Sequence, residues 1–342
     1  MPEPKFLVVR LSSLGDIVHT FPAVAGLRES FPTSEIVWLA HPRWKLLVES
    51  SGLATEVWPV ENHSLTSLRE VTRRIKKTKF NTALDYQGLW KSAALPFFGN
   101  VRRRIGFSSE SIREYGVPIL YTDRVRSTEA HVADQNGELS RRAGARSGTA
   151  GVKLAVPPSA ESTVREYLQT NGVARYVALS PGGGWRSKCW PPDRFGALCR
   201  KIRDSLGTGC IVNYGPGEES LAKEVRDASS GAGPLLYNGE LGPLMALLRN
   251  AICVVGGDTG PLHLAVALVT PAVALFGPTD PARNGPYRGS ATSGGALPRD
   301  IVLRSPNAVT TYKRGDQLDP FMLDIEVDAV FDAVRRQVEA RT

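Results

Sequence analysis

The side chains best suited to chemistry lie in short polar segments, each directly after an apolar run. The first segment, Ser12-Ser-Leu-Gly-Asp16, separates the run Phe6–Val9 from a helical pattern over Ile17–Ser30. A carboxylate at that place can cap the helix, whose dipole favours the charged form, or can act as a general base. His19, one helical turn further on, is expected in the core or in the same cleft. The residues alone leave both alternatives open.

A glycine-rich segment with two cations follows the apolar run Tyr176–Leu179. It reads Ser180-Pro-Gly-Gly-Gly-Trp-Arg186-Ser-Lys188. Three successive glycines leave backbone N–H groups open to an anion, and the two cations add positive charge. The spacing is not that of a P-loop. A flexible surface loop is the alternative, but the cations favour phosphate binding.

The segment Gly256-Gly-Asp258-Thr259-Gly260-Pro261-Leu-His263 carries the most specific local signal. It follows a buried strand pattern, and Pro261 suits the first position of a helix because no N–H is needed there. The N–H groups at the start of that helix favour a phosphate. Asp258 can cap the helix or accept a hydroxyl, and His263 can hydrogen-bond a ligand. An ordinarily capped helix would not need so many polar groups in one turn.

These segments need a scaffold that brings strand ends together. Short apolar runs alternate with helical patterns, which predicts an α/β fold with parallel sheets covered on both faces. A proline pair marks a boundary, so we expect Rossmann-like domains at 1–158 and 159–322, facing a cleft, and a closing amphipathic helix within 323–342. Ligands of such sheets bind at the carboxyl ends of the strands. Two further polar segments at such ends are Asp85-Tyr-Gln-Gly-Leu-Trp-Lys91-Ser and Phe276-Gly-Pro-Thr-Asp280.

The positive charge of the chain is concentrated in its first half. The net charge of the 342 residues is +8, and the part up to Lys153 holds 22 lysines and arginines against 15 acids. Basic residues cluster over 69–79 and at Arg102-Arg-Arg104. Such an excess indicates an anionic partner, and a solvated surface is the alternative. No motif that interleaves aromatic and basic residues for reading RNA is present, so a nucleic-acid partner is not expected.

Composition and cysteine spacing exclude several other classes of protein. The four cysteines lack the spacing of a zinc site or a disulfide framework, so we expect buried, reduced thiols. No apolar run reaches the roughly 18 residues of a spanning helix, and the start lacks a signal-peptide pattern. These features predict a cytoplasmic location. A nicotinamide-dependent oxidoreductase is disfavoured because the dinucleotide-binding glycine pattern is missing.

The motifs together resemble glycosyltransferase family nine, the bacterial lipopolysaccharide heptosyltransferases. The resemblance rests on Arg10-x-Ser-Ser-Leu-Gly-Asp-Ile-Val-His19, Asp85-x-Gln-Gly-x-x-Lys-Ser92 and Gly256-Gly-Asp-Thr-Gly-Pro-Leu-His-Leu-Ala265, with Phe276-Gly-Pro-Thr-Asp-Pro281 and Met322–Val330 in support. It runs in order from Arg10 to Val330 and is strongest for the heptosyltransferase I branch. It implies a GT-B fold whose last helix crosses back to the first domain.

The same resemblance implies an activity. It is inverting, metal-independent transfer of heptose from ADP-L-glycero-D-manno-heptose to the Kdo inner core of lipid A, without a cofactor, at the cytoplasmic face of the inner membrane. The basic first half would then contact the anionic glycolipid and the membrane surface. Two alternatives stay open: a GT-B enzyme that uses another nucleotide sugar or a protein acceptor, and a non-catalytic binder of nucleotides or nucleic acid. The oligomeric state is not predicted.

Roles for individual residues follow from the resemblance as well. Asp16 would be the general base, and Lys188 would stabilise the leaving diphosphate. The expected donor contacts are Ser180, Gly183, Arg186, Lys188, Glu218, Asp258, Thr259, Gly260, Pro261, Leu262 and His263. The expected acceptor contacts are Ser13, Gly15, His19, Gln87, Lys91, Arg104 and Arg113. Either Glu218 or Glu219 would meet the ribose. The segment Thr311–Phe321 has no cysteine, so bound iron is not expected.

Overall fold

A computed structural model describes residues 3–61, 64–112, 114–288 and 300–341. The chain divides into two compact units between Ala155 and Val156, three residues before the predicted boundary. Arg113, one of the expected acceptor contacts, lies outside the described residues. Each unit is described by itself below.

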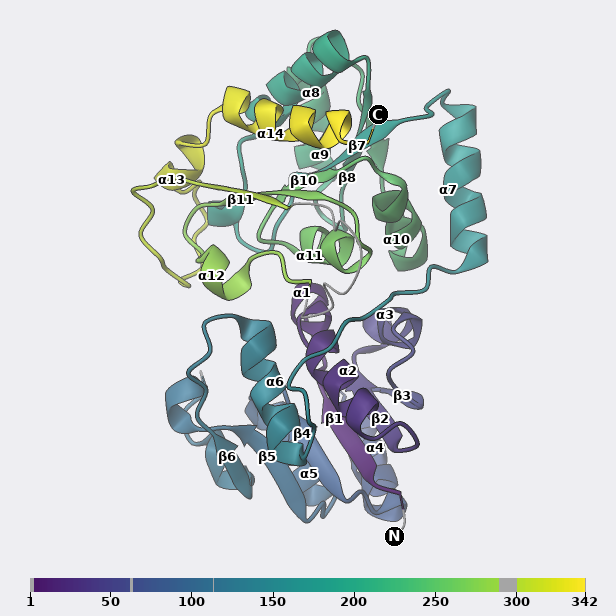
Figure 1. The fold of residues 1–342 in the computed structure, drawn as a ribbon, viewed down its shortest axis with the longest axis vertical. Coiled ribbons are helices and arrows are strands. Elements are labelled where there is room, and N and C mark those ends of the chain that lie inside the picture. The colour runs from purple at the N-terminus through teal and green to yellow at the C-terminus, as the bar shows by residue number, and fades with distance from the viewer. Residues whose placement is uncertain (1–2, 62–63, 113, 289–299, 342) are drawn as a thin grey trace. The chain divides into compact units, whose positions relative to one another are not determined.

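The first unit is built on a parallel sheet of six strands in the order β3-β2-β1-β4-β5-β6 (Figure 1). The strands are β1 (Lys5–Val9), β2 (Glu35–Ala40), β3 (Glu56–Pro59), β4 (Thr82–Asp85), β5 (Arg103–Phe107) and β6 (Asp123–Val125). Val9 lies opposite Leu39 on one side and Asp85 on the other. The polar segments that follow β1 and β4 therefore start at one edge of the sheet.

Helices cover both faces of this sheet, which is why its central strands are continuous apolar runs. The helices are α1 (Leu14–Val18), α2 (Phe21–Ser30), α3 (Lys45–Ser50), α4 (Leu65–Thr78), α5 (Trp90–Phe98) and α6 (Val132–Ala143), with 3₁₀ turns η1 (Pro42–Trp44), η2 (Ser109–Ser111) and η3 (Val117–Leu120). Helices α2 and α6 pack together, and α4 packs beside α5. The α4 and α5 side chains Val71, Ile75 and Leu95 share one core cluster with Leu7 and Val9 of β1.

The helical pattern over Ile17–Ser30 forms two helices rather than one. Helix α1 ends at Val18, and α2 begins at Phe21 with Pro22 in its first turn. Proline has no N–H to donate and fits only the first turn of a helix, so the chain restarts there. The break makes α1 a single short turn that carries Asp16.

The second unit repeats the architecture with the strand order β12-β11-β10-β7-β8-β9, again with all pairs parallel. Its strands are β7 (Tyr176–Ser180), β8 (Gly209–Asn213), β9 (Leu235–Tyr237), β10 (Val254–Gly257), β11 (Ala272–Phe276) and β12 (Ile301–Arg304). Its helices are α7 (Pro158–Thr170), η4 (Arg186–Lys188), α8 (Pro192–Leu206), α9 (Glu219–Ala228), α10 (Leu241–Asn250), α11 (Gly260–Ala267), α12 (Pro281–Asn284), α13 (Pro320–Leu323) and α14 (Val327–Glu339). Two parallel sheets with helices confirm the predicted α/β class.

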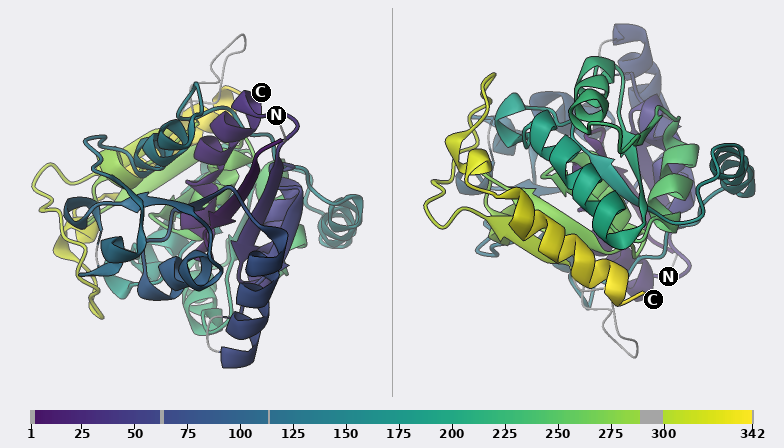
Figure 2. Two further views of the ribbon diagram at one scale, coloured as in Figure 1. Left: turned by 90° about the horizontal axis from the view of Figure 1, so that it is seen from below. Right: turned by 90° about the horizontal axis from the view of Figure 1, so that it is seen from above.

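The closing helix α14 packs within the second unit, beside α8 (Figure 2, right). A matched apolar stripe holds α14 against α8: one core cluster joins Leu198 and Ile202 of α8 to Val330, Ala333, Val334 and Val338 of α14. The expected contact of this helix with the first domain stays a prediction. The indole N–H of Trp190 also donates to the carbonyl oxygen of Ile325, at 2.9 Å.

Candidate functional site

Asp16 lies just beyond β1 with its carboxylate held from two directions. One oxygen lies 2.7 Å from Nη2 of Arg10, and the other accepts hydrogen bonds from the N–H (3.1 Å) and the hydroxyl (2.8 Å) of Ser13. The Asp16 side chain is still 46% exposed. The carboxylate therefore caps the start of α1, which is the first of the two alternatives expected from sequence. It is also exposed enough to contact a proton donor.

The segment after β4 holds the segment after β1 in place. The side-chain oxygen of Gln87 accepts the N–H groups of Leu11 (2.6 Å) and Ser12 (3.3 Å). Nη1 of Arg10 donates to the carbonyl oxygen of Tyr86. Gln87, expected to contact an acceptor, is thus engaged in positioning the loop that carries Asp16.

Asp85 organises that second segment from within the core. Its carboxylate accepts four hydrogen bonds, from the N–H groups of Gln87 (2.9 Å) and Gly88 (3.1 Å) and from the hydroxyls of Ser92 (2.9 Å) and Tyr121 (2.7 Å). Burial raises the pKa of Asp85, and the four hydrogen bonds oppose that rise. Sequence reasoning gave Asp85 no role. An aspartate at the end of a strand, however, often accepts the backbone N–H two residues further on and so forms an Asx-turn, as Asp85 does here with Gln87.

The remaining expected acceptor residues of the first unit differ in their surroundings. Ser13 and Gly15 lie on the loop and helix that carry Asp16, and Lys91 lies half-buried in the first turn of α5. His19 is buried at the end of α1, with its ring edge-on to His131 at 5.3 Å between centroids.

Arg104 is not brought to the strand-end edge. It pairs with Ala83 in the sheet, two residues before Asp85. Its guanidinium donates to the carbonyl oxygens of Leu120 (2.7 Å) and Val101 (2.6 Å), and burial lowers its pKa. Arg104 therefore holds loops of the first unit in this structure, and its expected acceptor contact stays a prediction.

In the second unit, a buried charge cluster forms where β10 meets α11. The two carboxylate oxygens of Asp258 lie 2.6 Å from Nζ of Lys188 and 2.9 Å from Nε2 of His263. A third, weaker contact comes from the side-chain amide of Asn284, at 3.4 Å. The side chains of Asp258, Lys188 and His263 are only 7%, 13% and 4% exposed. Burial alone would raise the pKa of Asp258, but the hydrogen bond and charge of His263 and the charge of Lys188 hold it well below its usual range.

Glycines allow the phosphate-loop candidate to lie directly over β10. A Cβ added at Gly257 would lie 2.7 Å from the carbonyl oxygen of Lys188, and one at Gly256 would lie 3.0 Å from that of Ser180. A Cβ at Gly183 would lie 3.2 Å from a methyl group of Thr259. Thr259 precedes α11, and its buried hydroxyl has no hydrogen-bond partner among the described residues. The expected donor residues at 183, 188 and 258–263 are therefore brought together.

Glu218, and not Glu219, faces the glycine-rich loop. Its carboxylate accepts the N–H of Gly215 at 2.8 Å and fills the space where a Cβ of Gly182 would stand. Glu219 instead pairs with Lys223 on the surface, at 2.8 Å. The sequence left Glu218 and Glu219 as alternatives for a contact with the ribose, and only Glu218 lies at the glycine-rich loop.

Two further expected donor residues are less directly placed at the cluster. The Ser180 hydroxyl is buried and donates to the side-chain oxygen of Asn213 at 2.6 Å, so it joins β7 to β8. Arg186 is exposed in η4, two residues before Lys188. Arg186 is therefore accessible to a ligand from solvent, whereas the Ser180 hydroxyl is not.

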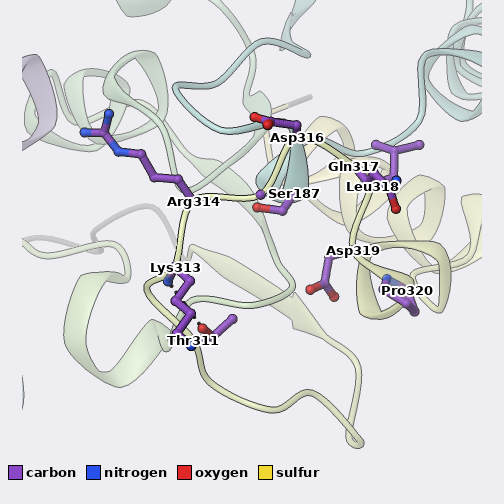
Figure 3. A pocket seen from close by; sticks show the side chains of 10 residues that line it. Ser187, Thr311, Lys313, Arg314, Asp316, Gln317, Leu318, Asp319 and Pro320 are labelled. Carbon is purple, nitrogen blue, oxygen red and sulfur yellow. Dashed lines mark hydrogen bonds between the residues drawn. The ribbon is translucent and has the colours of Figure 1, made fainter.

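A pocket of about 390 Å³ lies beside this loop, between Ser187 and the segment Thr311–Pro320 (Figure 3). The N–H of Ser187 donates to the carbonyl oxygen of Gly315 at 3.2 Å, which attaches that segment to η4. The lining supplies hydroxyl, amide and carboxylate groups next to the two cations Lys313 and Arg314. Such groups suit a ligand with many hydroxyls.

Trp185 connects this segment to the charge cluster. Nζ of Lys188 lies 4.2 Å from the Trp185 ring centroid, and the guanidinium carbon of Arg314 lies 6.0 Å from it. Arg314 is thus a further cation near the glycine-rich loop. Sequence reasoning missed it because 126 residues separate it from Lys188 and no local pattern links the two.

Neither metal ligands nor disulfides are evident in the part of the chain that the structure describes. No group of three or more His, Cys, Asp or Glu side chains there could hold a metal ion. All four cysteines are free thiols: Cys199, Cys210 and Cys253 are buried, and Cys189 is partly buried.

Comparison with known proteins gives consistent relatives. The model of the family described as "Glycosyltransferase family 9 (heptosyltransferase)" matches residues 68–301. Lipopolysaccharide heptosyltransferase 1 of Escherichia coli O18:K1:H7 is 26% identical over 90% of this chain and 96% of its own length. The Campylobacter coli protein of the same name is 22% identical over 97% of this chain and 98% of its own length.

Solved structures share the fold over nearly the whole chain. A family 9 glycosyl transferase from Veillonella parvula has a TM-score of 0.83 at 21% identity and covers 99% of this chain and 98% of its own. The E. coli ADP-heptose heptosyltransferase II has a TM-score of 0.81 at 20% identity, with 98% and 99% covered. An E. coli heptosyltransferase solved with ADP has a TM-score of 0.74 at 21% identity, with 97% and 99% covered. These likenesses confirm the predicted GT-B architecture.

The buried charge cluster generates a prediction about stability. Replacing Asp258 by asparagine leaves the Lys188 ammonium without its anion, so the free energy of unfolding at pH 7 should fall by roughly 3–5 kcal/mol. The Asp258 pKa is lowered in the folded state, so its ionised form stabilises the fold above pH ~4, and that stabilisation is lost as the pH falls below this value. The difference between wild type and Asp258→Asn should therefore shrink below pH ~4.

Urea unfolding at several pH values measures this difference. Glu219→Gln, which removes an exposed ion pair, is the matched control and should change stability little. A difference between wild type and Asp258→Asn that stays constant down to pH ~3 would contradict the prediction.

Proposed function

The chain belongs to glycosyltransferase family 9 (heptosyltransferase), whose model matches more than half of its length, and on that basis we propose that it transfers heptose from ADP-L-glycero-D-manno-heptose to the Kdo inner core of lipid A. The reaction would take place at the cytoplasmic face of the inner membrane, in lipopolysaccharide synthesis. The observation that carries the proposal is the Lys188–Asp258–His263 cluster at the start of α11, because a cation beside a helix N-terminus suits the charge of a diphosphate. The names of the relatives support the choice of sugar and acceptor class.

The donor diphosphate is proposed to bind where the glycine-rich loop meets α11. The N-terminus of an eight-residue helix presents unpaired N–H groups, and the unpartnered Thr259 hydroxyl lies beside them. Lys188 and Arg186 add cationic donors for the charge that develops on the leaving ADP. Asp258 and His263 hold Lys188 and one another in place, so these groups need little reorganisation during the reaction.

The rest of the donor is proposed to lie on either side of the diphosphate. The Glu218 carboxylate, which already reaches the glycine-rich loop, can accept hydrogen bonds from the ribose hydroxyls. The pocket beside Ser187 has room and polar groups for the heptose. Support for an adenine nucleotide comes from a fold neighbour solved with ADP and from another solved with ADP-2-deoxy-2-fluoro heptose.

Asp16 is proposed to act as the general base. Its carboxylate takes the proton of the acceptor hydroxyl while the hydroxyl oxygen attacks the anomeric carbon of heptose. The bond from that carbon to the diphosphate breaks on the opposite side, so ADP leaves and the configuration inverts. Arg10 and Ser13 fix the direction of the carboxylate, and its exposure leaves room for the acceptor.

A donor screen and a turnover assay test the proposed function. Binding of ADP, UDP, GDP and NAD is compared by calorimetry, followed by transfer from ADP-heptose to a Kdo–lipid A acceptor. We expect ADP to bind best and heptose to appear on Kdo. Tighter binding of another nucleotide, or transfer to a protein instead, would replace the proposed donor or acceptor within the same family.

The role of Asp16 predicts a selective loss of turnover. Asp16→Ala should lower kcat by about 10²–10⁴-fold, because that is the usual contribution of a positioned base. The Kd for ADP should not change, because the proposed diphosphate site is built from the second unit. Asp328→Ala, which removes an exposed aspartate from the first turn of α14, is the control. Near wild-type transfer by Asp16→Ala would exclude Asp16 as the base.

The role of Lys188 predicts a loss of phosphate recognition. Lys188→Ala should weaken binding of ADP by at least about tenfold, lower kcat and leave the weak binding of adenosine unchanged. Lys223→Ala, an exposed lysine of the same unit, is the control. Calorimetry with ADP and adenosine separates the effects, and equal losses for both ligands would indicate a general disturbance of the site.

Charge compensation by protein groups predicts that turnover does not depend on a divalent metal. Dialysis against EDTA should leave kcat and KM unchanged, because Lys188, Arg186 and the N-terminus of α11 would neutralise the negative charge of the diphosphate in place of a metal ion. Strong inhibition by EDTA that Mg²⁺ reverses would contradict the metal-independent mechanism.

A further inference from the structure

Large apolar side chains are exposed mainly in one stretch of the first unit. Among the described residues, ten such side chains are exposed, and six of them lie between positions 65 and 119. All the aromatic ones belong to this group. The six are Leu65, Trp90, Phe97, Phe98, Tyr115 and Ile119. Tyr115 is 96% exposed and Phe98 is 68% exposed, which is unusual for rings that could pack into the core.

These side chains belong to α4, to α5, and to η3 with the residues just before it, and these elements pack against one another. The two helices pack side by side, with Gly99 against Ile75, and η3 packs on α5. The rings of Phe97 and Phe98 meet edge-on at 5.3 Å between centroids. A Cβ added at Gly116, next to Tyr115, would lie 3.0 Å from the Trp90 ring. We call this surface the α4–α5 face; it consists of the six side chains above and the exposed residues of α4.

The same face carries a strong positive charge. The exposed cations of α4 and its cap are Arg69, Arg73, Lys76, Lys77 and Lys79, joined by Arg102, while Glu70 is the exposed acid among the α4 residues. Arg74 is a separate case, because it pairs with Glu56 at 2.7 Å and lies over the Trp58 ring at 3.8 Å. Helix α4 buries Val71 and Ile75 against the sheet, so its cations point away from the core.

Exposed aromatic rings bordered by lysine and arginine match the chemistry of an anionic lipid surface. Rings with apolar bodies enter the boundary between headgroups and acyl chains, and the cations contact lipid phosphates. A second copy of this chain would bring the same positive charge against itself, which opposes self-association through this face. Among the described residues, no helix is long and apolar enough to cross a membrane.

We propose that the α4–α5 face docks on the surface of an anionic phospholipid bilayer. The inference rests on the proposed function, since it names the surface by which the enzyme would reach a membrane-embedded acceptor. Docking would hold the first unit, with its Asp16 edge, at the layer in which the acceptor lies. An enzyme held at the membrane surface meets a higher local concentration of a membrane-embedded acceptor than an enzyme free in solution. This gain requires no further contact with the acceptor sugar.

Sedimentation of the full chain with vesicles tests the proposal. Vesicles of phosphatidylcholine alone are compared with vesicles that also contain phosphatidylglycerol, at low and high salt. We expect binding to the anionic vesicles and loss of binding at high salt, because exposed charges are screened. Lys76→Glu/Lys77→Glu should weaken binding by roughly tenfold or more, and Phe97→Ser/Phe98→Ser should also weaken it.

Matched variants of the second unit serve as controls. Arg165→Glu/Arg175→Glu removes two exposed arginines, and Val309→Ser/Leu323→Ser removes two exposed apolar side chains; both should bind vesicles like wild type. Wild-type binding by both face variants would overturn the proposal. Failure of the wild type to bind would also overturn it. So would sedimentation equilibrium that shows a dimer dissociated by Phe97→Ser/Phe98→Ser, because the face would then be covered by a second copy.

The two proposals fail in different ways. Face variants should transfer heptose normally to a water-soluble Kdo acceptor and more slowly to an acceptor embedded in vesicles. Normal turnover on the soluble acceptor also shows that the variants fold. A wild-type protein that binds anionic vesicles but transfers no heptose would leave docking intact and overturn the proposed function.

Discussion

The buried carboxylate of Asp258 is the constraint on which the strand-end edge of the second unit depends. An ionised group so deeply buried is tolerated only with an opposite charge and hydrogen bonds close by, and here Lys188 supplies the charge and His263 a second polar contact. The backbone of Lys188 packs against Gly257 of β10 at a distance that a Cβ would not allow, which places the glycine-rich loop beside Asp258. Loop, strand and helix α11 are therefore coupled through one carboxylate.

The first unit uses a buried carboxylate for a different purpose. Asp85 accepts hydrogen bonds from four neutral donors, which hold its own turn together. Through Gln87 and the carbonyl of Tyr86, this turn fixes the loop after β1, where Arg10 and Asp16 form an ion pair open to solvent. Aspartate thus organises the scaffold at one position and keeps its carboxylate open to solvent at another, according to its burial and its partners.

Much of this organisation could be predicted from sequence because it depends on local patterns. Buried parallel strands are continuous apolar runs, so β1, β2, β4, β7, β8, β10 and β11 were predicted together with the polar segments after them that hold Asp16, Lys188 and Asp258. Strands β3, β5, β6, β9 and β12 are less buried and were not predicted. Contacts between distant segments have no such signature. The bonds that occupy the Arg104 guanidinium, the position of Arg314 beside Trp185 and the packing of α14 on α8 depend on tertiary complementarity, which a single sequence does not display.

The glycines of the phosphate-loop candidate have a consequence for the thermodynamics of binding. Three successive glycines are typical of a flexible segment. Here a Cβ added at Gly182 would overlap the Glu218 carboxylate, and one added at Gly183 would lie 3.2 Å from a methyl group of Thr259 and 3.5 Å from Sγ of Cys189, whereas a Cβ at Gly184 would meet nothing. Gly182 and Gly183 therefore lie close against neighbouring side chains in the folded protein. Conformational entropy that these residues lose during folding would not have to be lost again when an anion binds to the loop.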